Sequence, residues 1–246
     1  MLIRIQCHKE VTILYPVNST TCIISGTDKR TIFQSSDDYK RFQDSLYLSN
    51  TRENINVRDR LKGVCNPYSI ERNNPLVAIG TYCLMPNHFH LLATPLYENG
   101  VSLFLQKLLT SYSMYFNQKY ERTGGLFEGK FKSQLADDGY LKYLFSYIHL
   151  NPVKLIQSDW KERGVEYVDV SYDFVSDYQH SSLPAYLGVD RPENKILDKQ
   201  AFPNYSNDYE DIKTELFEWL KYKNNENDLL GANVPRVAIG AYYSVA

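Results

Sequence analysis

The alternation of apolar and polar positions predicts several strands and helices in the first two thirds of the chain. Two apolar runs, residues 76–84 and 91–94, flank Met85-Pro86-Asn87 and have the length and composition of neighbouring strands. A further strand is expected near residues 20–25, followed by a turn at Gly26-Thr27-Asp28.

Helical periodicity recurs in three segments. Ser36 or Asp37 could cap a helix that runs to about Leu48, and a second helix is expected at 101–120. Asp137 or Asp138 could cap a third helix over 139–150, which Pro152 limits. The expected buried positions of the first two helices are Tyr39, Phe42, Leu46, Tyr47, Leu105, Leu108, Leu109, Tyr112 and Phe116. Residues 49–75 are polar and are expected to form a loop or a short helix.

Two histidines two residues apart are the first candidate for chemistry. Side chains at alternate positions of a strand project from the same face, so His88 and His90 should lie together, with Phe89 on the other face. A pair of imidazoles on a rigid strand is suited to bind a divalent metal. The alternative is two partly exposed histidines at a sheet edge, because so short a motif also arises by chance.

A second group of candidate residues lies at the end of the third helix. Tyr147 and Asn151 are four residues apart, which places them on one helix face about a turn apart, and Lys154 follows shortly. His149 is offset by two positions and should point elsewhere. Taken alone, Tyr140, Tyr143 and Tyr147 are better explained by core packing than by chemistry.

Basic residues on a predicted strand are the third candidate. Residues 126–133 read as a strand on which Glu128, Lys130 and Lys132 share one face, opposite Phe127 and Phe131. The lysines could contact a row of phosphates. They could equally belong to an ordinary solvated face.

Composition and charge narrow the classes of function. Residues 1–155 carry 18 Lys and Arg against 13 Asp and Glu, whereas residues 156–246 carry 9 against 16. A polyanion would therefore meet the first part of the chain. No apolar run is long enough for a membrane span, and the N-terminus does not read as a signal peptide. The four cysteines form no C-x-x-C pair, which favours reduced thiols in a cytoplasmic protein.

Together these motifs resemble the single-tyrosine HUH transposases, closest to the REP-associated tyrosine transposases. The resemblance spans roughly residues 20–156, with Met85-Pro86-Asn87-His88-Phe89-His90 and the Tyr-x-x-x-Asn-Pro-Val-Lys segment that starts at Tyr147 as its main blocks. It implies an α+β fold, a ferredoxin-like antiparallel sheet with helices on one face, plus a C-terminal extension. The histidines would lie on a central strand beside the tyrosine helix. Residues 1–156 would form the catalytic domain, and 157–246 an acidic extension of unknown role.

The resemblance also implies a reaction. Tyr147 would attack a DNA phosphodiester and form a 5′-phosphotyrosyl bond, which a second 3′-hydroxyl could reverse. His88, His90 and Asn151 would hold one Mg²⁺ or Mn²⁺ to polarise the phosphate. Lys130, Lys132 and Lys154 would contact DNA. Tyrosine is a weak nucleophile at neutral pH, since its reference pKa is about 10, so activation by the metal is part of this hypothesis.

The expected partner is single-stranded DNA with a nearby hairpin, and the family allows a homodimer. No membrane partner is expected, and the protein should be cytoplasmic, associated with a bacterial nucleoid when bound to DNA. The acidic segment after residue 156 is not expected to touch DNA. Two other functions stay open: a domesticated DNA-binding protein that has lost strand transfer, and an unrelated metal hydrolase that uses His88 and His90.

Overall fold

The fold is organised around a four-stranded antiparallel sheet. The computed structural model describes residues 3–5, 13–15, 19–128, 132–136, 138–202 and 209–221. The sheet has the order β4-β5-β3-β6, so β5 and β3 are central. Its strands are β3 (Ser19–Ser25), β4 (Val77–Met85), β5 (His88–Pro95) and β6 (Lys132–Ala136), and a separate hairpin pairs β1 (Ile3–Ile5) with β2 (Ile13–Tyr15). The predicted α+β class with an antiparallel sheet is confirmed.

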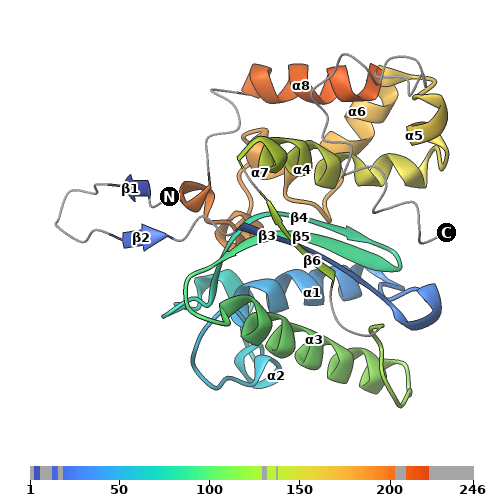
Figure 1. Ribbon diagram of the computed structural model, residues 1–246. Coiled ribbons are helices and arrows are strands. Elements are labelled where there is room, and N and C mark those ends of the chain that lie inside the picture. Colours follow the sequence, from blue (N-terminus) through green and yellow to red (C-terminus); the bar gives the residue numbers. More distant parts are fainter. Residues whose placement is uncertain are drawn as a thin grey trace.

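Helices cover both faces of this sheet (Figure 1). One face packs on α1 (Ser36–Leu48) and α3 (Gly100–Lys119), with the short α2 (Val57–Arg60) beside α3. The other face packs on α4 (Asp138–Leu150). Beyond α4 follow α5 (Trp160–Arg163), α6 (Val168–Ser176), α7 (Leu183–Tyr186) and α8 (Tyr209–Lys221), and short 3-10 turns lie at Thr27–Lys29, Pro67–Ser69, Asn151–Leu155, Pro192–Ile196 and Lys199–Ala201.

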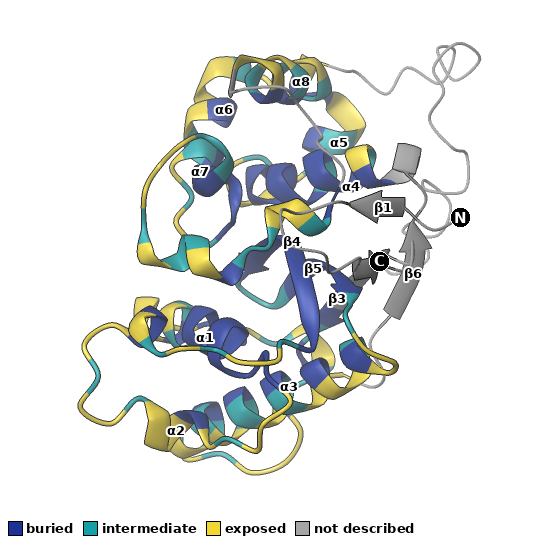
Figure 2. Cartoon of the chain, turned by 90° about the vertical axis from the view of Figure 1, so that its left-hand side faces the viewer, coloured by how far each residue is buried: buried dark blue, intermediate teal, exposed yellow. Residues whose placement is uncertain are grey.

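Both faces are covered because both are apolar. Phe89, Leu91 and Ala93 of β5 are buried against the α1 and α3 layer. Leu92 of the same strand is buried against α4 on the opposite side. In Figure 2, β4 and β5 are accordingly dark blue between two layers of helices. The expected layer of helices on one face is therefore present as α1 and α3, and α4 with the extension adds a second layer.

The β4–β5 hairpin is tighter than the pattern indicated. Met85 pairs with His88, so only Pro86 and Asn87 connect the strands, and β5 begins at His88 rather than at Leu91. The register shifts between Ile79 and Thr81, which makes Gly80 a bulge. His88 and His90 are thus both part of the strand, as the candidate metal site requires.

Three smaller expectations need correction. The cap of α1 is Ser35, not Ser36 or Asp37, and the Asp38 carboxylate accepts the backbone N–H of Ser35 at 3.0 Å. Regular strand β6 starts at Lys132, so residues 126–128 are not a strand; Phe127 makes only an isolated bridge to Gly26. The helix expected at 139–150 is present as α4. The chain then continues through Pro152 as the 3-10 turn Asn151–Leu155, because the first turn of a helix can accommodate a proline.

Residues after 156 pack directly on the sheet. The backbone N–H of Ser182 donates to the carbonyl of Tyr82, and the N–H of Leu84 donates to the carbonyl of His180, both at 2.9 Å. These bonds cover the outer edge of β4, which would otherwise present unpaired backbone groups. No helix in the described ranges is long and apolar enough to cross a membrane.

Candidate active site

The two histidines meet on the α4 face of the central strand. His88 and His90 are adjacent same-face positions of β5, and their Nε2 atoms lie 3.1 Å apart. Phe89, between them, points into the opposite core and contacts Phe42 at a ring-centroid distance of 4.8 Å. The expectation that His88 and His90 share one face is therefore confirmed.

Asn87 orients the first histidine. The Nδ1 atom of His88 lies 2.7 Å from Oδ1 of Asn87, so the amide oxygen favours a proton on Nδ1 and leaves the Nε2 lone pair free. The Asn87 carbonyl accepts the Gly26 N–H at 2.9 Å, which anchors this turn on the end of β3. A histidine held in this way has the tautomer that a metal ligand requires.

Tyr147 lies next to the histidine pair. Its ring stands edge-on to the imidazole of His90, with centroids 5.7 Å apart and an interplanar angle of 79°. The Nδ2 atom of Asn151 donates to the Tyr147 carbonyl at 2.7 Å, so the Asn151 amide is held one turn below the tyrosine. His149 points away: it is fully buried, and its Nε2 atom lies 2.8 Å from Oγ of Ser182.

Two lysines make this region electropositive. The Nζ atom of Lys161 lies 3.7 Å from the centre of the Tyr147 ring. Burial, with the charge of Lys154 nearby, lowers the pKa of Lys161 to about 7. Burial also lowers the pKa of His88 to about 4, and the charges of Lys154 and Lys161 add to this effect. Burial holds the pKa of His90 well below its usual value, with His88, Lys161 and Lys154 adding to the effect, so both imidazoles are neutral at pH 7.

Of the three lysines predicted to contact DNA, the structure describes the positions of Lys154 and Lys132. Lys154 is exposed at the end of the 3-10 turn after α4. Lys132 occupies the first position of β6, where it is in register with Ile23, which is itself in register with His90. Two strand spacings separate that position from His90, roughly 10 Å. Lys130 lies outside the described residues.

The neutral nitrogens of His88 and His90 fit a divalent metal. Two nitrogen ligands about 2.1 Å from one ion at right angles would be about 3.0 Å apart, close to the 3.1 Å between the Nε2 atoms. Among the described residues, no group of three His, Cys, Asp or Glu side chains could hold a metal ion. Further ligands would therefore come from an amide such as Asn151 or from the substrate, and the Asn151 assignment stays a prediction.

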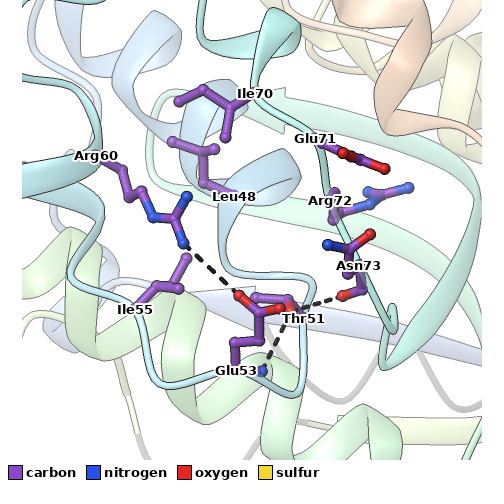
Figure 3. A pocket seen from close by; sticks show the side chains of 9 residues that line it. All are labelled: Leu48, Thr51, Glu53, Ile55, Arg60, Ile70, Glu71, Arg72 and Asn73. Carbon is purple, nitrogen blue, oxygen red and sulfur yellow. Dashed lines mark hydrogen bonds and ion pairs between the residues drawn. The ribbon is translucent and has the colours of Figure 1, made fainter.

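A small cavity elsewhere is not a substrate site. Leu48, Thr51, Glu53, Arg60 and Arg72 are among the residues around it, on the α1 side of the sheet (Figure 3). Its volume is about 20 Å³, enough for roughly one water molecule. Arg60 is paired with Glu53 at 3.6 Å. The groups with the chemistry of a reaction thus gather at His88, His90 and Tyr147.

The region that contains the two histidines is similar to a known protein family. Residues 46–151 match the family model described as "Transposase IS200 like", and the matched region contains both histidines and ends on Asn151. In this region the chain is similar to the IS200-like transposases. The resemblance seen in the sequence is confirmed for this region.

The chain was also compared with solved structures and with curated proteins. A solved structure described as "Structure of the REP associates tyrosine transposase bound to a REP hairpin" overlaps 81% of this chain and 98% of its own, at 14% identity and a TM-score of 0.45. No curated protein matches the chain.

The site contains two residues that sequence reasoning did not select, Lys161 and Asn87. Lys161 lies outside the matched region, in a segment whose net charge is negative, and nothing in its spacing relates it to Tyr147. Asn87 is part of the block that carries the histidines, but its bond to His88 depends on the two-residue turn. A polar residue directly before a histidine pair is the one signal that could have indicated a supporting role.

Proposed function

We propose that the protein cleaves and rejoins single-stranded DNA through a covalent bond between Tyr147 and a 5′-phosphate. The observation that carries this proposal is the placement of the Tyr147 ring against His90, beside the paired Nε2 atoms. Of the aromatic residues on α4, Tyr143 stacks on Tyr147 at 5.8 Å and contacts Trp219 of α8 on its other side. Of these two described tyrosine side chains, Tyr147 is the one whose ring contacts His90.

The chain's own residues account for the steps of the reaction. The Tyr147 hydroxyl oxygen forms a bond to phosphorus, and the bond from phosphorus to the 3′-oxygen breaks. The phenolic proton passes to solvent, and the leaving 3′-oxygen takes up a proton from solvent to become a hydroxyl. Because the new ester keeps the energy of the old one, a second 3′-hydroxyl can attack it and join the strands. The Asn151 bond to the Tyr147 carbonyl keeps the helix end in place during this exchange.

His88, His90 and Asn151 would hold a Mg²⁺ or Mn²⁺ ion. When bound, such an ion supplies charge neutralisation at the phosphate. Asn87 holds the His88 ring by its Nδ1 atom, and the low pKa of both imidazoles keeps their lone pairs available at neutral pH. Lys130, Lys132 and Lys154 would contact the DNA backbone, and the substrate would be a single strand with a hairpin.

Formation of a covalent adduct is the test of this function. The full chain is incubated with single-stranded hairpin DNAs and Mn²⁺, and products are separated under denaturing conditions. We expect a protein–DNA species that survives denaturation, and digestion with mass spectrometry should place the nucleotide on the peptide that contains Tyr147. Metal-dependent cleavage without any covalent species would instead indicate a hydrolase.

A second function is favoured by the charge around the histidines. Lys154 and Lys161 lie close enough to lower the pKa of both imidazoles, and no carboxylate completes a metal site among the described residues. The two lysines would attract the phosphates of a bound strand whether or not a metal is present. A domesticated DNA-binding protein that has lost strand transfer would bind hairpin DNA equally well with Mn²⁺ or with a chelator, and would form no adduct.

A further inference from the structure

We propose that Lys161, which belongs to the C-terminal extension, contacts the phosphate that Tyr147 attacks. The inference rests on the proposed function of Tyr147 and deepens it, because it makes the extension part of the active site. Its basis is geometric: the Lys161 ammonium lies over the Tyr147 ring, 3.7 Å from its centre. The phenolic oxygen projects from the edge of that same ring. A phosphate bonded to this oxygen would have its non-bridging oxygens within reach of the ammonium.

The Lys161 ammonium has no anionic partner in the described part of the chain. Its Nζ atom lies over the ring of Tyr147 and 5.5 Å from the ring centre of Trp160. Its nearest charged influences are Lys154, which opposes its charge, and Glu162, whose attraction is the smaller effect. A desolvated cation without a counter-charge costs free energy. A phosphate at the Tyr147 hydroxyl would supply the missing negative charge.

The position of Lys161 is built by its surroundings. Trp160, the preceding residue, is buried in the core that α4 shares with the extension. The Gln157 side chain fastens the loop around α5: its Nε2 atom donates to the Gly164 carbonyl at 2.8 Å, and its Oε1 atom accepts the Glu166 N–H at 3.0 Å. Since both ends of the four-residue helix are held, Lys161 is directed toward Tyr147 rather than into solvent.

Arg163, the other basic residue of α5, has a carboxylate partner. Arg163 is exposed and pairs with Asp159 at 3.1 Å on the outer side of the helix. Lys161 is thus the cation of α5 that faces the tyrosine. Arg163→Met is a matched control, because it removes a long cation from the same short helix without touching the site.

The test measures recognition of a terminal phosphate without metal or turnover. Binding of a single-stranded oligonucleotide with a 5′-phosphate is compared with that of the same oligonucleotide with a 5′-hydroxyl, in the presence of a chelator. For the unaltered full chain we expect about tenfold tighter binding of the phosphorylated strand. Lys161→Met should abolish that preference, Lys161→Arg should retain part of it, and Arg163→Met should keep it in full.

Two outcomes overturn the inference: no phosphate preference in the unaltered chain, or the same preference in Lys161→Met. Thermal unfolding separates a structural role, since loss of a partly desolvated charge without an anionic partner should leave the midpoint unchanged or raise it. A marked fall in the midpoint of both Lys161→Met and Lys161→Gln would mean that the lysine supports the fold instead. Adduct formation at Tyr147 is measured separately, so failure of the proposed reaction and failure of the Lys161 contact give different results.

Discussion

The Tyr147 ring stands edge-on to the imidazole of His90, with 5.7 Å between ring centroids. Strand β5 and helix α4 are far apart in the sequence, and their packing brings a potential nucleophile to the paired histidines. We expect Tyr147→Phe to eliminate both DNA cleavage and the denaturation-resistant adduct, while single-strand binding persists. The change removes one oxygen and keeps the ring, so the free energy of unfolding should change by less than about 1 kcal/mol.

Tyr143→Phe is the control for that variant, because Tyr143 lies one turn earlier on the same helix and stacks on Tyr147. It should form the adduct at a rate close to that of the unaltered chain. Loss of the adduct in Tyr143→Phe, together with its retention in Tyr147→Phe, would reassign the nucleophile.

His88→Ala should remove Mn²⁺ binding and cleavage together. The Nε2 atoms of His88 and His90 are 3.1 Å apart, so loss of one imidazole removes half of the paired nitrogens. Calorimetric titration with Mn²⁺ measures the first effect, and circular dichroism checks that the fold persists. Binding of Mn²⁺ that is unchanged in His88→Ala would remove this histidine from the metal site.

Asn87→Ala tests the support of His88 rather than the ligand itself. The Asn87 amide oxygen lies 2.7 Å from Nδ1 of His88, and loss of such an outer bond typically weakens metal binding about 10- to 100-fold. We expect Asn87→Ala to bind Mn²⁺ more weakly and to cleave DNA more slowly. An excess of Mn²⁺ should restore both metal binding and cleavage. If Asn87→Ala binds Mn²⁺ as tightly as the unaltered chain, the hydrogen bond does not orient the ring for a metal.

The double variant Lys130→Ala/Lys132→Ala should weaken DNA binding evenly across sequences. Lys132 is the first residue of β6 and is in register with His90 across the intervening strand β3. Each lost phosphate contact should reduce the salt slope of single-strand binding by roughly 0.7. A slope equal to that of the unaltered chain would show that both lysines only face solvent.

Stability should depend on pH through His180. Burial lowers the pKa of His180 to about 4, and the positive charge of Arg191 adds to the shift; the ring stacks on Tyr39 with centroids 3.8 Å apart. In the unfolded chain this pKa is about 6.5. Between these values the unfolded chain binds a proton that the folded protein does not, so stability is lost as the pH falls, by at most about 1.4 kcal/mol per pH unit.

His180→Phe keeps an aromatic ring beside Tyr39 but cannot titrate. Urea unfolding at about pH 7 and about pH 4.5 should therefore show a smaller loss of stability in acid for the variant than for the unaltered chain. An identical loss in both would mean that other groups carry the acid sensitivity.

Local pattern accounts for much of the site because two of its features depend only on backbone periodicity. A strand alternates faces, so His88 and His90 had to lie together once β5 formed. A helix repeats after about four residues, so Tyr147 and Asn151 had to lie a turn apart once α4 formed. The apolar stripe of α3 followed in the same way, although Phe104, which is fully buried, was not among its predicted positions.

Tertiary structure decided which of these local features meet. No sequence period relates β5 to α4, and the packing of α4 on the face that carries the histidines places Tyr147 at His90. The same holds for Lys161: burial of Trp160 and the bonds of Gln157 turn it toward the tyrosine. Contacts between distant segments depend on the shape and burial of whole layers, and this is why a lysine in an acidic segment became part of the site.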